Sequence, residues 1–256
     1  MEKIDGFIVS IFLDTTEKLD NYYVFNKKKT FNTCFLKILY KLFGRHIKSN
    51  KFYYNYIAVT FNRVYFLKNL LKNMIFFDDC YDLIGESILD VGCGAAPASI
   101  ALASLVQNKK EKNISISLID RSKKQLSIAK DIAQIMSIKI KSYTEASFDV
   151  GIKKYSDLVV FSYFFCEQKK KFLKKIFNNR GKFEEGFVVI DYKENIMKIE
   201  KYFRDNGDYN IKSIFLNYAV PECLSEFIHD KKVNIYGCIY KPEKESKELF
   251  YCMEKL

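Results

Sequence analysis

One short segment of the sequence combines an acidic residue with two glycines at a spacing that suits ligand binding. Residues 87–101 read SILDVGCGAAPASIA. The apolar run at 88–91, which contains Asp90, fits a buried strand. Gly92 and Gly94 let the backbone turn tightly and approach a ligand, and Pro97 suits the first turn of a helix. These residue types in this order predict a strand–turn–helix unit that cradles a nucleotide-type cofactor.

The same spacing argues against two other cofactor-binding turns. A dinucleotide fingerprint needs a third glycine three residues after the second, and this chain has Pro97 there. A P-loop ends in Gly-Lys-Ser or Gly-Lys-Thr, and no lysine occurs between Gly92 and Val106. Turns that hold a pyrophosphate or a triphosphate are therefore disfavoured.

The order acid-x-Gly-x-Gly resembles the first motif of class I S-adenosylmethionine (SAM) methyltransferases. Asp90, Gly92 and Gly94 match that motif, whereas Ala95 and Ala96 stand where the family more often has glycine. The resemblance implies that the turn passes under the methionine part of SAM. It also implies that Asp90 orients the turn and the ammonium group of the ligand.

A second strand and helix follow this unit. Residues 114–120 alternate apolar and polar side chains before Asp120, and residues 122–136 carry a helical pattern. The resemblance makes Asp120 the ribose ligand, because a carboxylate can accept hydrogen bonds from both ribose hydroxyls. The alternative is that Asp120 only caps the helix that begins near Ser122. The complete set of cofactor-binding residues that we expect is Asp90, Gly92, Cys93, Gly94, Asp120, Arg121, Glu145 and Ser162.

The rest of the chain continues the alternation of strands and helices. Further strands are expected at residues 138–140, 157–162 and 186–191, and helices at about 166–177 and 194–206. Two β-rich runs, 211–219 and 233–240, would form an antiparallel final pair joined through a short helix at 221–230. This order predicts an α/β fold, a doubly wound, mostly parallel, seven-stranded Rossmann-like sheet that binds ligands at the carboxyl ends of its strands.

The part of the chain before this sheet is basic and has a helical pattern. Two amphipathic helices, at about 30–47 and 57–74, predict an N-terminal helical lobe over residues 1–80, followed by a SAM-binding domain over 81–256. The formal net charge is +11. Residues 24–77 contain eleven basic residues and no acid, whereas the remainder holds 31 basic and 31 acidic residues. All of the net charge therefore lies in one stretch.

Tyrosines and phenylalanines are interleaved with these basic residues. Cations that attract phosphates, beside rings on which bases stack, predict a surface for RNA or another single strand. The expected contacts are Lys27, Lys28, Lys29, Arg45, Lys48, Lys51 and Arg63. The alternative is a compositional bias, since the whole chain is rich in Lys, Asn, Ile, Tyr and Phe, as AT-rich genomes encode. That bias does not explain the missing acids.

The predicted end of the fourth strand offers a methyl-acceptor site. Methyl transfer from SAM is an in-line displacement that depends mainly on alignment, and often no acid–base residue is needed. Amino methyltransferases of nucleic acids place Asp/Asn-Pro-Pro-Tyr here, but this chain has Ser162-Tyr163-Phe164-Phe165. We expect Tyr163 to act in catalysis by stacking on a planar substrate. The alternative is that Tyr163 only packs at the junction, and Cys166 is better explained by burial than as a nucleophile.

A narrower resemblance covers residues 56–205. The segments SILDVGCGAAPASIALASL, SLIDRSKKQLSIAK, DLVVFSYFFCE and GFVVIDY are similar to the methyltransferase-like family associated with assembly of the small ribosomal subunit. Members of that family often carry extra cysteines that bind an iron–sulfur cluster. The cysteines of this chain do not have a spacing that supports one.

Composition excludes several other classes of protein. The seven cysteines form no C-x-x-C pair, which favours free thiols in a reducing, cytoplasmic environment over disulfides or zinc. Two histidines are too few for a metal site built on several imidazoles, and no apolar run approaches the ~18 residues that span a bilayer. We therefore expect no metal and no membrane partner. The predicted function is SAM-dependent methylation of RNA or a ribosome-associated substrate. The alternatives are a small-molecule methyltransferase with the N-terminal lobe as a lid, or a SAM-binding assembly protein without turnover.

Overall fold

The computed structural model describes residues 2–19, 51–146, 158–165, 171–180, 183 and 186–242 of the 256-residue chain. Within 51–64 and at 171 the description covers the backbone only. The predicted helix at 30–47, Cys166 and most of the predicted RNA contacts lie outside the described residues. Those contacts are Lys27, Lys28, Lys29, Arg45 and Lys48.

The described residues form one central eight-stranded sheet. Its strands are β1 (Glu2–Lys3), β2 (Ser87–Val91), β3 (Ser115–Asp120), β4 (Ile140–Glu145), β5 (Leu158–Ser162), β6 (Phe187–Asp191), β7 (Ile211–Ala219) and β8 (Lys232–Tyr240). Their order is β1-β7-β8-β6-β5-β2-β3-β4, with β8 antiparallel to both β6 and β7 and the other pairs parallel. The predicted doubly wound, mostly parallel sheet is confirmed, and the two-residue β1 adds an eighth strand at one edge.

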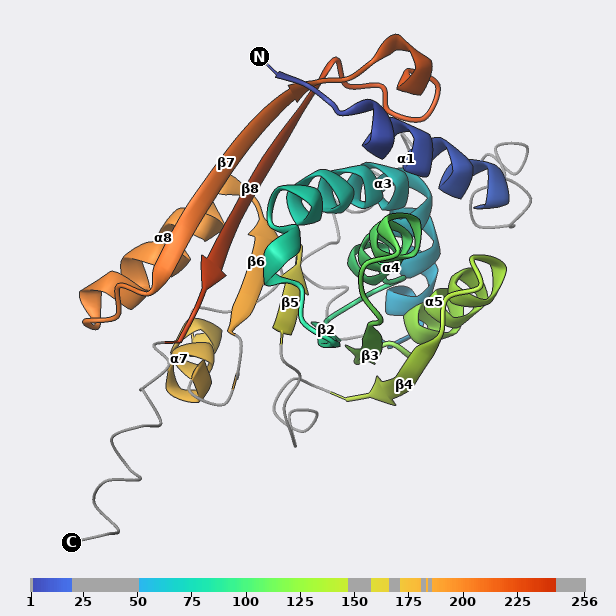
Figure 1. The fold of residues 1–256 in the computed structure, drawn as a ribbon. Helices are drawn as coiled ribbons and strands as arrows, with labels where there is room; N and C mark the ends of the chain where they lie inside the picture. Colours follow the sequence, from blue (N-terminus) through green and yellow to red (C-terminus); the bar gives the residue numbers. More distant parts are fainter. Residues whose placement is uncertain are drawn as a thin grey trace, which may run out of the picture.

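Helices cover both faces of the sheet (Figure 1). One face carries α1 (Gly6–Leu19), α3 (Lys51–Asp79), α4 (Pro97–Lys109) and α5 (Lys123–Ile135), and the other carries α7 (Lys171–Asn179) and α8 (Lys193–Asp205). Each face has its own cluster of buried apolar side chains. The three-layer arrangement explains why the central strands read as continuous apolar runs. Every residue of β6 is buried, because helices cover it from both sides.

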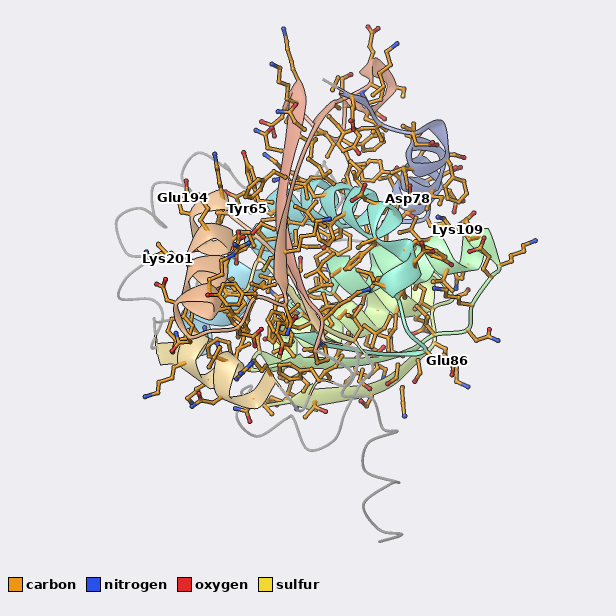
Figure 2. All side chains as sticks on the ribbon, turned by 60° about the vertical axis from the view of Figure 1, so that its left-hand side comes forward. Tyr65, Asp78, Glu86, Lys109, Glu194 and Lys201 are labelled. Carbon is orange, nitrogen blue, oxygen red and sulfur yellow. The ribbon has the colours of Figure 1, made fainter. Side chains whose placement is uncertain are left out.

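The first described residues pack directly against the sheet domain. Helices α1 and α3 share one buried cluster with α4, α5 and the strands. In Figure 2, Asp78 at the end of α3 lies beside Lys109 at the end of α4, and their charged atoms are 2.8 Å apart. The boundary at residue 80 stays a prediction, and the structure shows how closely the segments on its two sides are packed.

Three predicted elements differ from the observed ones. Strand β4 spans Ile140–Glu145 instead of residues 138–140, because Ser137 has a φ of +54° and the amide of Ile138 donates to the carbonyl of Ala133, which ends α5. Residues 221–230 form a loop with a single 3₁₀ turn, Glu222–Leu224, instead of a longer helix. Helix α3 is longer at both ends than the predicted 57–74.

Candidate cofactor and acceptor site

The predicted site residues lie at the carboxyl ends of the parallel strands. From β2 the chain proceeds through β3 to β4 on one side, and later through β5 to β6 on the other. Open α/β sheets bind ligands beyond the strand ends at such a reversal of strand order. We call the ends of β2 and β3 the cofactor side, and the ends of β5 and β6 with the adjoining part of α3 the acceptor side.

The glycine turn after β2 has the backbone conformation that its residue types favour. Gly92 and Gly94 have φ values of +66° and +57°. The amides of Gly92 and Cys93 both donate to the carbonyl of Ile119, at 2.7 and 3.2 Å, which holds the turn against β3. A Cβ atom on Gly94 would meet nothing closer than 3.9 Å, so this part of the backbone is open to a ligand.

Gly92 is required by a contact that the sequence did not reveal. A Cβ atom at this position would lie 2.2 Å from the ring of Phe164, which follows β5. The Phe164 ring itself packs against Phe161 and Phe172, with centroids 5.7 and 4.9 Å away. The glycine therefore lets the turn after β2 and the segment after β5 pack against each other.

Asp90 is a fully buried carboxyl group beneath the turn. Its Oδ2 accepts a hydrogen bond from the Ser99 hydroxyl at 2.7 Å, whereas its Oδ1 has no partner among the described residues. Burial raises the pKa of Asp90 to about 7, with the nearby Asp120 carboxylate adding to the rise and the Ser99 hydrogen bond opposing it. The site thus holds one buried carboxyl oxygen that makes no hydrogen bond within the described residues.

Asp120 connects the glycine turn to the start of α5. Its Oδ2 accepts from the amide of Gly94 at 2.9 Å, and its Oδ1 accepts from the amide of Ser122 at 2.7 Å. The helix cap itself is Ser122, whose hydroxyl accepts from the amide of Gln125 at 3.3 Å. A carboxylate has about four acceptor positions, so these two hydrogen bonds alone do not fill those of Asp120.

The other predicted cofactor residues lie at the same edge but differ in exposure. The Cys93 side chain is buried in the core, and burial raises the pKa of its thiol, so only its backbone can face a ligand. Arg121 is exposed directly after β3. Glu145 is the exposed last residue of β4, and the amide of Ala146 donates to the carbonyl of Asp120 at 3.1 Å.

On the acceptor side, the end of β5 meets α3, and Ser162, which the sequence predicts as a cofactor-binding residue, lies at this junction. The Ser162 hydroxyl donates to Oδ1 of Asn73 at 3.1 Å, and Asn73 is fully buried. Tyr163 has a φ of +53°, uncommon for a residue other than glycine, and its amide donates to the carbonyl of Ile190 at 2.7 Å. Strained conformations of this kind concentrate at functional sites.

Two further side chains, those of Tyr192 and Lys72, lie beside the Tyr163 ring. Tyr192, the first residue after β6, meets it edge to face, with centroids 5.8 Å apart. The ammonium of Lys72 on α3 lies 5.5 Å from the ring centroid. Burial lowers the pKa of Lys72 to about 8, helped by Lys68 and opposed by Asp230. The sequence did not single out Lys72, Asn73 or Tyr192, although Lys72 belongs to the acid-free basic segment.

The predicted RNA contacts on α3 have only their backbone described. Lys51 is the first residue of α3, and Arg63 lies in its first half. Their side chains and those of the other predicted contacts lie outside the described residues, so this surface stays a prediction.

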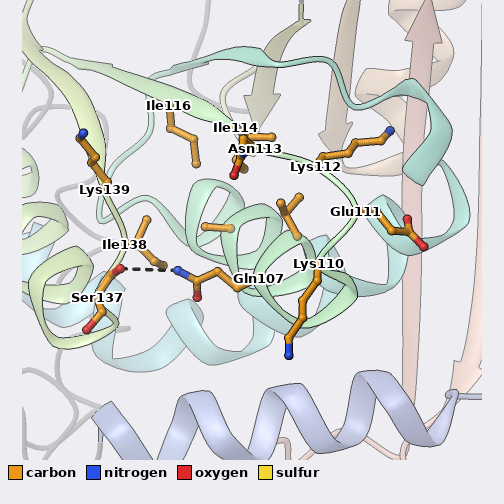
Figure 3. A pocket seen from close by; sticks show the side chains of 12 residues that line it. Gln107, Lys110, Glu111, Lys112, Asn113, Ile114, Ile116, Ser137, Ile138 and Lys139 are labelled. Carbon is orange, nitrogen blue, oxygen red and sulfur yellow. Dashed lines mark hydrogen bonds between the residues drawn. The ribbon is translucent and has the colours of Figure 1, made fainter.

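Elsewhere, the amino ends of β3 and β4 border a pocket (Figure 3). It lies between the last turns of α4 and the residues that follow α5, where the Gln107 amide donates to the carbonyl of Ser137 at 3.5 Å. This is the opposite end of the sheet from the glycine turn. Within the described ranges, no group of three or more His, Cys, Asp or Glu could hold a metal ion. In the same part of the chain, no helix is long and apolar enough to cross a membrane.

A comparison with protein families identifies one domain. Residues 82–253 match the sequence model of a family described as a methyltransferase domain. A search of curated proteins found no match. The fold is similar to precorrin 8w decarboxylase of Methanobacterium thermoautotrophicum, with 17% identity, a TM-score of 0.49 and coverage of 66% of this chain and 88% of that one.

Two other solved structures share the fold. Magnesium protoporphyrin IX methyltransferase of Synechocystis PCC 6803, solved with bound SAM, is 12% identical with a TM-score of 0.47, over 83% of this chain and 98% of that one. An rRNA methylase of Streptococcus thermophilus is 11% identical with a TM-score of 0.45, over 66% of this chain and 95% of that one. The names of these proteins refer to different substrates, so the similarity shows the fold alone.

Proposed function

This chain belongs to the methyltransferase domain family, and from that premise we propose that it transfers the methyl group of SAM to RNA or to a ribosome-bound substrate. The protein is a SAM-dependent methyltransferase, and the nature of the acceptor is the proposal. Bound SAM supplies a methyl group on a positively charged sulfur. The chain supplies the groups that hold the cofactor and align the acceptor.

The residues of the cofactor side fit SAM. Oδ1 of Asp90 is a buried acceptor without a partner among the described residues, which suits a cationic ammonium group. The backbone at Gly94 is open, and the Asp120 carboxylate beside it is the group to which we assign the two ribose hydroxyls. In this proposal Arg121 and Glu145 border the site near the adenine, and Cys93 contributes through its backbone.

The residues of the acceptor side hold a planar group. Tyr163 contributes an aromatic ring, and its backbone is fixed by the hydrogen bond from its amide to the carbonyl of Ile190. Ser162 contributes a hydroxyl group. Phe164 and Phe165 pack against each other directly after them, which makes the floor of this side apolar. Alignment next to the methyl group is the main requirement of an in-line displacement, so Tyr163 acts by positioning the acceptor.

The position of α3 is the observation that carries the RNA proposal. The acid-free basic segment at 24–77 ends in α3, and its Lys72 and Asn73 meet the end of β5. The end of the segment that holds all of the net positive charge therefore borders the acceptor side. A polyanionic acceptor is expected to follow such a segment into the site. The buried free cysteines are in keeping with the reducing, cytoplasmic location that we propose.

Salt dependence of RNA binding tests the proposal. For single strands, the slope of log affinity against log salt is about −0.7 for each phosphate contact. Replacement of Lys27, Lys28 and Lys29 by Gln should flatten the slope by up to ~2 and leave SAM affinity unchanged. The control is the replacement of Lys198, Lys201 and Lys212, which are exposed on α8 and β7, by Gln. Equal slopes in both variants would contradict the proposal.

The position of α3 also suits the second candidate, a small-molecule methyltransferase with a lid. Because α3 packs beside Ser162 and Tyr163, it can cover a small acceptor. This candidate predicts no salt slope and full activity in both triple variants. A protein that binds SAM and RNA without turnover would retain the slope but transfer no radiolabelled methyl group to RNA.

A further inference from the structure

Lys72 is fixed beside the acceptor side by its neighbour in the sequence. Asn73 is fully buried and makes two hydrogen bonds, from its Nδ2 to the carbonyl of Asn69 at 2.7 Å and to its Oδ1 from the Ser162 hydroxyl at 3.1 Å. The second bond ties α3 to the end of β5. The backbone of Lys72 therefore has a defined position next to Tyr163, which follows Ser162 directly.

The charges around Lys72 are not balanced. Lys68 lies one helical turn earlier and forms an ion pair with Asp230. Lys72 is half-buried, and the described residues offer its ammonium the Tyr163 ring but no hydrogen-bonded carboxylate. Two ammonium groups thus share one acid. A partly desolvated cation without an acidic partner is a costly arrangement that an incoming anion would relieve.

We propose that Lys72 binds a phosphate group of the acceptor while the attached nucleobase packs against Tyr163. This inference rests on the proposed function and names the residue that recognises the nucleotide next to the reacting base. The two chemical parts of a nucleotide, a flat ring and an anion, match the two groups that the site places together. Lys72 acts as a substrate-binding residue, and the reaction requires no proton transfer to it.

Binding of defined oligonucleotides tests the assignment. The probes are a short single-stranded oligouridylate, the same oligomer with uncharged methylphosphonate linkages, and uridine with and without a 5′-phosphate. Lys72→Met should lower the affinity for the charged oligomer about tenfold, which corresponds to the loss of one charge-assisted hydrogen bond. It should leave the uncharged oligomer unchanged. Lys201→Met is the matched control, because Lys201 is an exposed lysine on α8 (Figure 2).

The pH dependence separates recognition from a structural role. The titratable groups near Lys72 are Lys68 on the same helix, His229 and Asp230 in the loop before β8, and Tyr163. Wild-type affinity for the charged oligomer should fall as pH rises through about 8, because the Lys72 ammonium is lost. Lys72→Arg keeps its charge and should remove this fall.

Each outcome bears on a different claim. Equal affinity of the wild type and Lys72→Met for the charged oligomer would overturn the inference, even if the RNA were methylated. Loss of affinity for charged and uncharged oligomers alike would also overturn it, since the effect would then be structural. Lys72-dependent binding of the uridine phosphate without binding of either oligomer would support the inference and contradict RNA as the acceptor. SAM affinity measured in each variant checks that the fold is intact.

Discussion

The cofactor side and the acceptor side are built in different ways. The cofactor side comes from consecutive residues, 90–122, and its polar groups are two carboxylates and a series of backbone amides. The acceptor side joins α3 to the ends of β5 and β6, which follow it by about 90 residues and more in the chain, and its groups are an ammonium and aromatic rings. A cationic cofactor and an anionic acceptor would each meet the opposite charge.

This difference means that the two sides should respond separately to substitution. Changes on the cofactor side should alter SAM affinity, and changes on the acceptor side should alter turnover at unchanged SAM affinity. Phe164 is the exception, because its ring touches both sides through Gly92. Substitutions at Gly92, Asp120, Asn73 and Asp90 test this separation.

The largest effect is expected for Gly92→Ala. The alanine would have to adopt a positive φ, and its Cβ would collide with the Phe164 ring. We therefore expect the unfolding free energy to fall by about 2 to 5 kcal/mol and SAM binding to be lost. Gly207→Ala is the matched control. Gly207 has a φ of +79° with open space around it, so its substitution should cost only about 1 kcal/mol.

Urea unfolding and calorimetric titration of SAM measure both variants. In a Phe164→Ala background, the collision is removed, so Gly92→Ala should cost no more there than Gly207→Ala costs in the wild type. An equal cost of the two glycine substitutions in the wild-type protein would show that Phe164 does not constrain the turn.

Asp120→Ala should weaken SAM binding by about 1.5 to 3 kcal/mol, because charge-assisted hydrogen bonds to the ribose are lost. Ser122→Ala separates this effect from capping, since it removes only the cap of α5 and should cost about 1 kcal/mol of stability. Titration calorimetry should find the SAM affinity of Ser122→Ala unchanged. If both variants lost affinity equally, Asp120 would be a structural residue of the turn and not a ribose ligand.

Asn73→Ala should act on the acceptor side alone. The substitution removes the hydrogen bond that the Ser162 hydroxyl on β5 donates to Asn73 on α3. We expect the free energy of unfolding to fall by about 1 to 2 kcal/mol and kcat to be lower. SAM affinity should stay at the wild-type value. A double-mutant cycle with Ser162→Ala should give a coupling energy of about 0.5 to 1.5 kcal/mol. A coupling near zero would contradict the link between the two elements.

The smallest effect is a pH dependence from Asp90. Burial raises its pKa in the folded state from the ordinary 3.8 to about 7, so the folded protein holds a proton that the unfolded chain releases. Stability contributed by this group therefore falls as pH rises, by about 1.4 kcal/mol between about pH 6 and about pH 8. Asp90→Asn should remove this fall, as urea unfolding at several pH values can measure. An identical pH profile in wild type and variant would mean that Asp90 is already ionised below this range.

Much of the fold and of the cofactor side follows from the sequence by itself. Strand β7 has the predicted ends, α4 begins at Pro97 as predicted, and both glycines of the turn have the positive φ values that favour glycine. These features depend on dihedral preferences and on periodic burial, which are local properties of a short stretch. The order of strands and helices then leaves few topologies, because crossovers between parallel strands have one hand.

The acceptor side depends on tertiary structure. The basic segment and the helical pattern of residues 57–74 predicted a charged helix, but not that its Lys72 and Asn73 would meet the end of β5. Likewise, the contact of Phe164 with Gly92 has no sequence signal. A helical pattern predicts that one stripe of side chains is buried, but it does not predict which strand the stripe packs against. That choice is made only when α3 packs across the sheet, where the fit of side chains from distant segments decides which residues meet.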